Sequence, residues 1–236
     1  MSRGKRIFDL FWTVTGLLVL SPLLAIVSLL IRVEDGGPVF FRQERVGHRG
    51  KRFRIWKFRT MVVDAEKNGM PLTVGRDARI TRLGHWLRKL KLDELPQLFN
   101  VLSGDMSLVG PRPEVPQYVA LYDSFQRQVL DLVPGITDPA SLKYRQESDL
   151  LARASDPERT YVEQIMPEKI RLNLEYARHA TVWTDFLVII RTLAALPAGL
   201  RGPWAVEGRP SRSRIVGRNV FPGGTSTGGT GRSVSG

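Results

Sequence analysis

The stretch KRIFDLFWTVTGLLVLSPLLAIVSLLIR, residues 5–32, decides how the rest of the chain folds. Asp9 is the one ionisable residue between its basic flanks, and most other side chains in it are apolar. As a continuous helix, the part between the flanks reaches about 37 Å, which is enough to cross the hydrocarbon core of a bilayer. The sequence therefore predicts a membrane helix at the N-terminus, followed by a separate domain.

Two other interpretations of this run are less favourable. A signal peptide has a shorter apolar region and is followed by a small-residue cleavage site, which is not evident here. A buried helix of a soluble protein would need a larger protein around it, because the run is apolar on all sides.

Ser21 and Pro22 stand almost at the centre of the run. Pro22 lacks an N–H and its ring clashes with the carbonyl four residues earlier, so we expect a kink there. Positive residues lie at both ends, Lys5 and Arg6 before the run and Arg32 after it, and positive flanks favour the cytoplasmic side. A kinked, re-entrant helix that enters and leaves on one side satisfies both flanks, whereas a straight span does not.

The composition excludes several kinds of site. The chain has 236 residues, enough for one domain with a core, and it has no cysteine. Disulfides, thiolate zinc sites and cysteine nucleophiles are therefore excluded, and because the three histidines stand far apart, a hard cation on carboxylates is the expected kind of metal. The net charge of +12 and the pI of about 10.5 favour an acidic partner, which is nucleic acid, anionic lipid or a phosphorylated small molecule.

We divide the chain into three parts. Residues 1–35 form the re-entrant membrane helix, residues 36–203 form a cytoplasmic domain, and residues 204–236 form a flexible basic tail rich in Gly, Ser, Thr and Arg. The expected fold class is α+β and mainly helical, with a small basic β-hairpin and amphipathic interfacial helices around the active site.

The segment VFFRQERVGHRGKRFRIWKFRTM, residues 39–61, is typical of two strands joined by a glycine-containing turn. Its second strand carries Lys57 and Arg59 on one face and interleaves basic with aromatic residues. This pattern occurs at nucleic-acid surfaces and equally at membrane interfaces, and a solvated hairpin without a ligand is a third interpretation.

Amphipathic patterns predict the remaining elements. Residues 81–92 place their large apolar side chains on one stripe, and a second helix is expected to begin at Asp93. A turn at Ser103 and Gly104 should lead into a short strand. Residues 156–200 are expected to be helical and to end in a core or interfacial helix.

Within KLKLDELPQ, residues 89–97, Asp93 and Glu94 stand side by side in basic surroundings. Helix capping is the simplest interpretation, because Asp is a good N-cap and Glu in the first turn favours the helix dipole. A reactive acidic pair is the alternative, and its basic neighbours should then keep Asp93 ionised.

Arg112 stands between Pro111 and Pro113. The two prolines restrict the backbone on both sides, so little entropy is lost when the guanidinium is held for an oxyanion. A plain surface turn is the alternative.

The order of several motifs now becomes informative. KRIFDL, the Ser21-Pro22 break, GPVFFRQERVG, KFRTM, LDELPQLFNVLSGDMSLVGPRPE and PGIT occur in this order. Together they resemble the bacterial sugar transferases, and more closely the catalytic unit of the monotopic, minimal polyprenyl-phosphate phosphoglycosyl transferases. The resemblance covers residues 5–196.

The resemblance implies an enzyme of the EC 2.7.8 type. It would move a sugar-1-phosphate from a UDP-sugar to polyprenyl (undecaprenyl) phosphate and release UMP, in the synthesis of a surface glycan such as an exopolysaccharide. It further implies contact with membrane lipid, no nucleic acid, and a monotopic location on the cytoplasmic face of the bacterial inner membrane. The sugar, the pathway and a homodimer stay open.

The resemblance also assigns roles to residues. Asp93 is expected to be the nucleophile that forms a covalent phospho-sugar intermediate, and Glu94 is expected to hold Mg2+. The expected phosphate-handling positions are Lys57, Arg59, Arg88 and Arg112, the last with its flanking Pro111 and Pro113. One departure is Asp138, which stands where many members have glycine after PGIT, and its role stays open. The rival function is a polybasic, membrane-anchored protein without catalysis that binds nucleic acid or anionic lipid.

Overall fold

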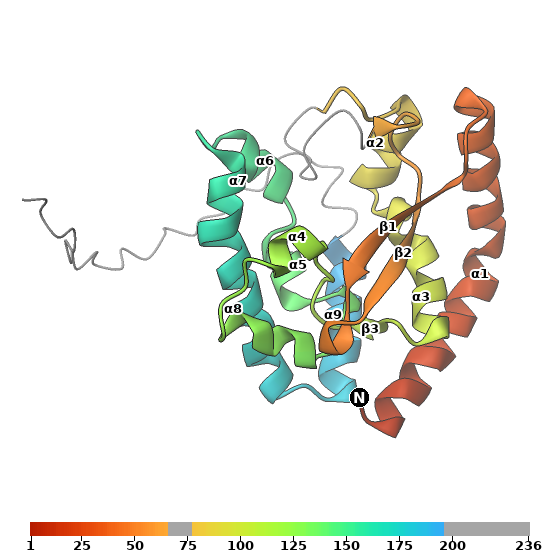
Figure 1. The fold of residues 1–236 in the computed structure, drawn as a ribbon. Helices are drawn as coiled ribbons and strands as arrows, with labels where there is room; N and C mark the ends of the chain where they lie inside the picture. The colour runs from red at the N-terminus through yellow and green to blue at the C-terminus, as the bar shows by residue number, and fades with distance from the viewer. Residues whose placement is uncertain (66–76, 196–236) are drawn as a thin grey trace, which may run out of the picture. The chain divides into compact units, whose positions relative to one another are not determined.

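The computed structural model describes residues 1–65 and 77–195 (Figure 1). The chain divides into two units, Met1–Pro203 and Trp204–Gly236, and everything described belongs to the first. The expected tail falls outside the described residues. The unit is mainly helical, as predicted, and it contains two small sheets, of which the hairpin was predicted.

The α-helices are α1 (Arg3–Asp35), α2 (Arg82–Lys89), α3 (Leu98–Ser103), α4 (Pro116–Val119), α5 (Pro139–Lys143), α6 (Glu147–Ala152), α7 (Pro157–Thr160), α8 (Met166–Arg178) and α9 (Val182–Ala195). The 3-10 helices are η1 (His48–Gly50), η3 (Leu92–Gln97) and η4 (Gln126–Asp131), and η5 (Tyr161–Ile165) is a π-helical turn. The strands are β1 (Phe40–Val46), β2 (Arg52–Phe58), β3 (Ser107–Val109) and β4 (Gly135–Thr137).

The N-terminal run forms α1, a single helix of 33 residues with Pro22 inside it. Because Pro22 has no N–H, the carbonyl of Leu18 loses its usual helical partner. The hydroxyl of Ser21 donates to that carbonyl at 2.8 Å, which satisfies it locally. The helix continues through the proline, and the kink expected there stays a prediction.

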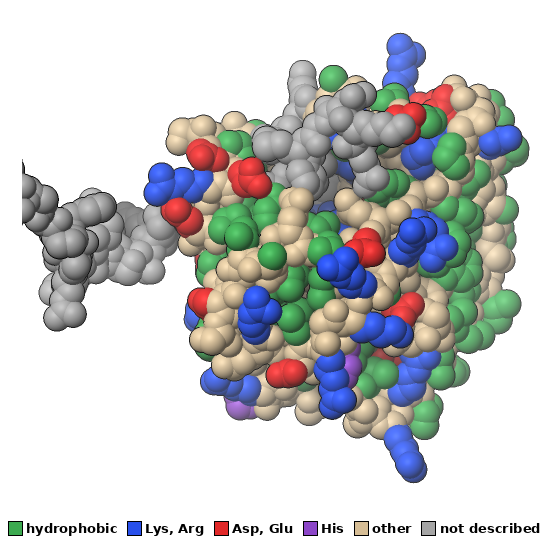
Figure 2. Space-filling view, viewed as in Figure 1, with side chains coloured by type: hydrophobic (Ala, Val, Ile, Leu, Met, Phe, Trp, Pro, Cys, Tyr) green, Lys and Arg blue, Asp and Glu red, His purple; other side chains and the backbone are tan. Residues whose placement is uncertain are grey.

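Most of the apolar surface of α1 faces outward. Leu18 and Val19 are 71% and 72% exposed, whereas Val27 and Ile31 pack against Phe58 of the hairpin and its neighbours. Figure 2 shows hydrophobic side chains gathered along the edge that α1 forms. Within the described part of the chain, α1 is the one helix long and apolar enough to cross a membrane, and its exposed surface supports membrane association.

The predicted hairpin is confirmed. Strands β1 and β2 pair antiparallel, with Phe41 opposite Lys57 and Arg45 opposite Phe53. The burial of β2 alternates, so that Phe53 and Ile55 lie in the core. The register follows from this alternation, because a slip of one residue would turn the apolar side chains to solvent.

The helices after the hairpin differ from the prediction at their ends. α2 is shorter than expected, because the hydroxyl of Thr81 caps it by accepting from Gly84 N at 2.9 Å and Lys91 then turns the chain with φ 57°. Asp93 does not begin an α-helix but lies in the 3-10 helix η3, which leads into α3.

The second sheet joins two glycine-containing segments that are distant in sequence. β3 pairs parallel with β4, and Gly110 N donates to Thr137 O at 3.0 Å. A side chain at Gly135 would meet Gly110 N at 2.1 Å, so the two backbones approach closely only because both residues are glycine. This pairing was not predicted. It places β4 beside the start of the Pro-Arg-Pro segment.

Asp138 has a structural role at this point. It is 1% exposed, and its carboxylate accepts from Ser141 N at 2.9 Å at the start of α5. It therefore acts as the N-cap of that helix.

Candidate active site

Asp93 and Glu94 lie in η3, between α2 and α3, and both are buried. The left-handed conformation of Lys91 turns the chain directly before them. The chain thus carries two adjacent carboxylates into the interior, which is costly unless they are compensated.

The carboxylate of Asp93 is the less compensated of the two. Its Oδ1 is buried without a hydrogen-bond partner, and the residue at the N-cap position is Lys91, without a side-chain cap. The capping interpretation therefore does not account for Asp93. Burial and the adjacent Glu94 raise the pKa of Asp93, and the charges of Lys57, Lys91 and Arg88 offset only part of this. The basic neighbours therefore favour the ionised form of Asp93 less than the sequence analysis predicted.

Glu94 is closely ion-paired. Arg112 donates from Nη2 to Oε1 at 2.6 Å and from Nη1 to Oε2 at 3.1 Å, and Lys57 Nζ lies 3.2 Å from Oε1. Burial acts to raise the pKa of Glu94, but Arg112 and Lys57 hold it well below its ordinary value. The two neighbouring carboxylates are therefore electrostatically different.

Lys57 and Arg112 reach Glu94 from different parts of the chain. Lys57 comes from the end of β2 and Arg112 from the segment after β3. Burial lowers the pKa of Lys57 to about 8, with Glu94 opposing the shift, whereas Glu94 raises the pKa of Arg112. Arg112 stays charged, while Lys57 can lose its proton at moderately alkaline pH.

The other predicted cations divide between two places. Arg88 of α2 donates from Nε to Thr60 Oγ1 at 2.8 Å, and its charge acts on Asp93. Arg59 instead pairs with Asp35 at the end of α1, at 2.5 Å from Nη1 to Oδ2, and donates to Pro38 O. Five of the predicted residues therefore lie together in the structure, namely Asp93, Glu94, Lys57, Arg88 and Arg112. Arg59 lies apart from them and pairs with Asp35 at the end of α1.

The backbone on both sides of Arg112 is held. Pro111 O accepts from Gly135 N at 3.0 Å, and Pro113 O accepts from Arg45 Nη1 at 3.2 Å. Sequence reasoning missed Arg45, although it lies in the quoted RQERVG motif. It also missed Lys91, which follows the basic end of α2 and acts on both carboxylates.

The donor atoms present fit Mg2+. The described residues contain no group of three or more His, Cys, Asp or Glu side chains that would hold a metal by themselves. Mg2+ is usually bound through one or two carboxylates together with substrate phosphates. Glu94 and the unpartnered Oδ1 of Asp93 are donor atoms of this kind, and Glu94 would have to exchange Arg112 or Lys57 for the ion.

A family model described as "Bacterial sugar transferase" matches residues 1–199. The chain belongs to the bacterial sugar transferase family. The predicted resemblance is confirmed, over a range that includes every candidate site residue.

Individual sugar transferases of known name are also similar to the chain. The undecaprenyl-phosphate glucose phosphotransferase of Komagataeibacter xylinus is 39% identical over 196 residues, 80% of this chain and 35% of that protein. The UDP-N-acetylgalactosamine-undecaprenyl-phosphate N-acetylgalactosaminephosphotransferase of Aeromonas hydrophila is 36% identical over 201 residues, 83% of this chain and 44% of that protein. The chain spans less than half the length of these two relatives.

A third relative matches along most of its length. The exopolysaccharide production protein ExoY of Sinorhizobium fredii is 32% identical over 208 residues, 82% of this chain and 85% of that protein. The names of the relatives place the family among the undecaprenyl-phosphate sugar phosphotransferases, transferases of the EC 2.7.8 type, and they differ in the sugar.

Proposed function

We propose that this sugar transferase moves a sugar-1-phosphate from a UDP-sugar to undecaprenyl phosphate and releases UMP. The observation that carries the proposal is the buried, unpartnered oxygen of Asp93 beside an ion-paired Glu94 and several cations. A structural carboxylate would normally have its hydrogen bonds satisfied when buried. An oxygen without a partner, held among cations, suits attack on a phosphoryl group.

The reaction has two displacements. In the first, an Asp93 oxygen attacks the phosphorus that carries the sugar, the bond to the UMP oxygen breaks, and UMP leaves with the electron pair. In the second, an undecaprenyl phosphate oxygen attacks the aspartyl phospho-sugar, which forms the lipid diphospho-sugar and restores the Asp93 carboxylate. A covalent intermediate divides one difficult displacement into two easier ones.

The cations of the site offset the charge on the phosphoryl oxygens. Arg112 has a planar guanidinium that suits bidentate contact with a phosphate, and Lys57 and Arg88 add positive charge on other sides. Bound through Glu94, Mg2+ would supply further neutralisation of the diphosphate. Arg112 would exchange its present partner, Glu94, for a donor phosphate.

The acceptor is a lipid, and α1 is suited to bring the site to a membrane. We propose that α1 is re-entrant, kinked at Ser21-Pro22, on the cytoplasmic face of the inner membrane. Polar contacts at both helix ends support this. Lys5 Nζ lies 2.5 Å from an oxygen of Asp185, and Asp35 at the other end pairs with Arg59. Because the two ends of α1 form ion pairs with the same domain, we expect both ends on the same side of the bilayer.

Release of UMP tests the proposal. Purified protein in detergent or nanodiscs, given a panel of UDP-sugars with Mg2+ and undecaprenyl phosphate, should release UMP and form the lipid diphospho-sugar with at least one donor. A polybasic membrane protein without catalysis would bind anionic lipid but release no UMP from any donor in the panel. The same panel identifies the sugar.

A further inference from the structure

We infer that Arg45, Glu114 and Tyr161 form a partly buried frame that positions Arg112 for the donor phosphates. The inference rests on the proposed function and adds three positioning residues to it. Hydrogen bonds join the three to one another and to the Pro-Arg-Pro segment and not to Glu94, so they would act through that segment.

Arg45 joins the hairpin to this segment. Its Nη1 donates to Pro113 O at 3.2 Å and to Glu114 Oε1 at 3.4 Å, and its Nη2 donates to Gln43 Oε1 at 2.6 Å. One residue further, Val46 N donates to Glu114 O at 2.9 Å. The end of β1 therefore holds the chain directly after Arg112.

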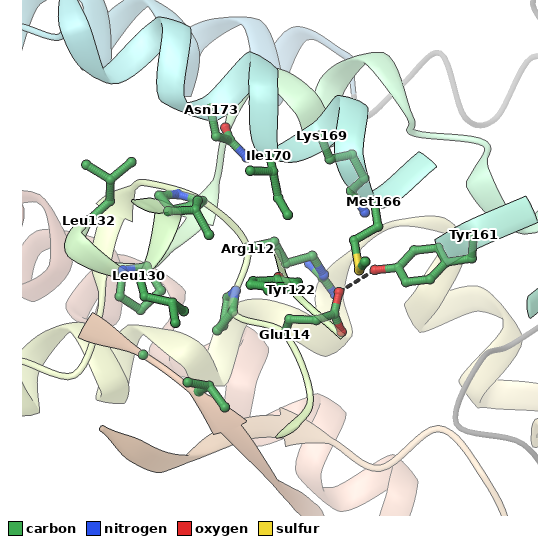
Figure 3. Close-up of a pocket in the computed structure, with 16 residues that line it drawn as sticks. Arg112, Glu114, Tyr122, Leu130, Leu132, Tyr161, Met166, Lys169, Ile170 and Asn173 are labelled. Carbon is green, nitrogen blue, oxygen red and sulfur yellow. Dashed lines mark hydrogen bonds between the residues drawn. The ribbon is translucent and has the colours of Figure 1, made fainter. Parts of the chain in front are cut away.

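Glu114 is the centre of the frame, because three donors converge on its carboxylate. Besides Arg45, Oε1 accepts from Val115 N at 2.9 Å, and Oε2 accepts from the hydroxyl of Tyr161. Figure 3 shows Tyr161 directed at Glu114, with a dashed line for their hydrogen bond. Tyr161 belongs to the π-helical turn η5, an irregularity that is often found at functional sites.

The charges explain why the frame has an acid at its centre. The side chains of Arg45 and Glu114 are each 17% exposed, and the Nε of Arg45 is buried without a partner. Arg45 lies close enough to Arg112 for their charges to repel. Glu114 balances Arg45 as Glu94 balances Arg112, which lets two cations share a small buried volume.

Packing alone does not hold the segment from the side of α8. A cavity of about 40 Å³ lies there, lined by residues that include Arg112, Glu114, Tyr161, Lys169 and Asn173 (Figure 3). This is room for a few water molecules. Val115 of the segment packs with Met166 and Ile170 of α8. Side chains leave space beside Arg112 itself, so there the hydrogen bonds of the frame add to packing in fixing the segment.

Tyr161→Phe removes one donor to Glu114 and keeps the ring. We expect the KM for the UDP-sugar to rise about tenfold or more, because small displacements of a positioning group are costly. The KM for undecaprenyl phosphate and the melting temperature should change little. Glu114→Gln should give a larger effect in the same direction, since it leaves Arg45 unbalanced beside Arg112.

Tyr118→Phe is the matched control. Tyr118 is as buried as Tyr161 and their rings lie 5.1 Å apart, but its hydroxyl contacts the exposed Glu158 at 3.4 Å. If Tyr118→Phe raises the donor KM as much as Tyr161→Phe does, the effect is general packing and the inference is wrong.

A double-mutant cycle tests whether the frame acts through Arg112. The effects of Tyr161→Phe and Arg112→Lys on donor KM should combine to less than their product if both act on one contact. Independent, fully multiplicative effects would overturn the inference while the proposed function stood. Failure of the wild-type enzyme to release UMP would remove the proposed function, and the inference with it.

Discussion

Arg112 and Glu94 form a two-point ion pair, with guanidinium-to-carboxylate distances of 2.6 and 3.1 Å. Both residues are expected to serve the same reaction, one on the donor phosphate and the other on Mg2+. Their pairing leaves neither of these two charges without a partner of opposite sign in the partly buried site. When the donor and Mg2+ bind, Arg112 must exchange Glu94 for a donor phosphate, and Glu94 must exchange Arg112 for Mg2+.

Arg112→Lys should impair turnover although it keeps the positive charge. Lysine cannot form the planar fork to either Glu94 or a phosphate, so we expect kcat/KM for the donor to fall about 10- to 100-fold. The measurement is UMP release at limiting UDP-sugar. Arg159→Lys is the control, because Arg159 is 71% exposed and pairs with the nearby Glu163, away from the site. Full activity of Arg112→Lys would exclude a bidentate role.

The lowered pKa of Lys57 predicts that the proposed activity depends on pH. With a pKa of about 8 in the folded protein, Lys57 is charged below that pH and neutral above it. We therefore expect kcat/KM for the donor to decline as the pH rises through about 8.

Lys57→Arg provides the test of that assignment. Arginine keeps its charge throughout this range, so the alkaline decline should disappear from the pH profile of any activity that the variant retains. An active Lys57→Arg enzyme with an unchanged decline would assign the titration to another group.

Glu94→Gln should weaken the binding of Mg2+ while the protein remains folded. An amide oxygen is a poorer ligand for a hard cation, and the change also leaves Lys57 and Arg112 without their carboxylate. We expect the Mg2+ concentration for half-maximal UMP release to rise about tenfold or more. Glu158→Gln, at an exposed position, should leave the Mg2+ titration unchanged.

The membrane arrangement can be tested because the chain has no cysteine. Arg3→Cys, at the start of α1, and Lys51→Cys, in the exposed turn of the hairpin, should be labelled by an impermeant reagent from the same side of sealed vesicles. Pro22→Ala should favour a straight span and separate the two labels. Labelling of the unchanged helix from opposite sides would contradict the re-entrant arrangement.

Local pattern predicted the elements whose signal lies within a few residues. Two strand-like stretches around a glycine-containing turn predicted the hairpin, and the long apolar run predicted α1. Three-residue strands have no such periodicity, so the parallel pairing of β3 with β4 could not be predicted. The left-handed turn at Lys91 has no periodic signal either. Because of this turn, α2 ends earlier than predicted and α3 begins after Asp93 and not at it.

The site was predicted as a set of residues but not as an arrangement. Asp93, Glu94 and Arg112 were identified by motif, yet the contact between Glu94 and Lys57 spans 37 positions and the frame contact between Arg45 and Glu114 spans 69. Such contacts depend on the fold as a whole. The lowered pKa of Glu94 and the raised pKa of Asp93 arise from burial and from these distant charges, so sequence neighbours alone could not give them.

The most direct test of the account is whether Asp93 becomes covalently modified by the donor alone. Enzyme, UDP-sugar and Mg2+ without acceptor should release UMP in a burst of about one per site. Mass spectrometry should then find the added phospho-sugar on the peptide that contains Asp93. Asp93→Asn should abolish the burst and the modification while the protein remains folded. A fully active Asp93→Asn enzyme, or turnover in wild type without modification of Asp93, would contradict the account.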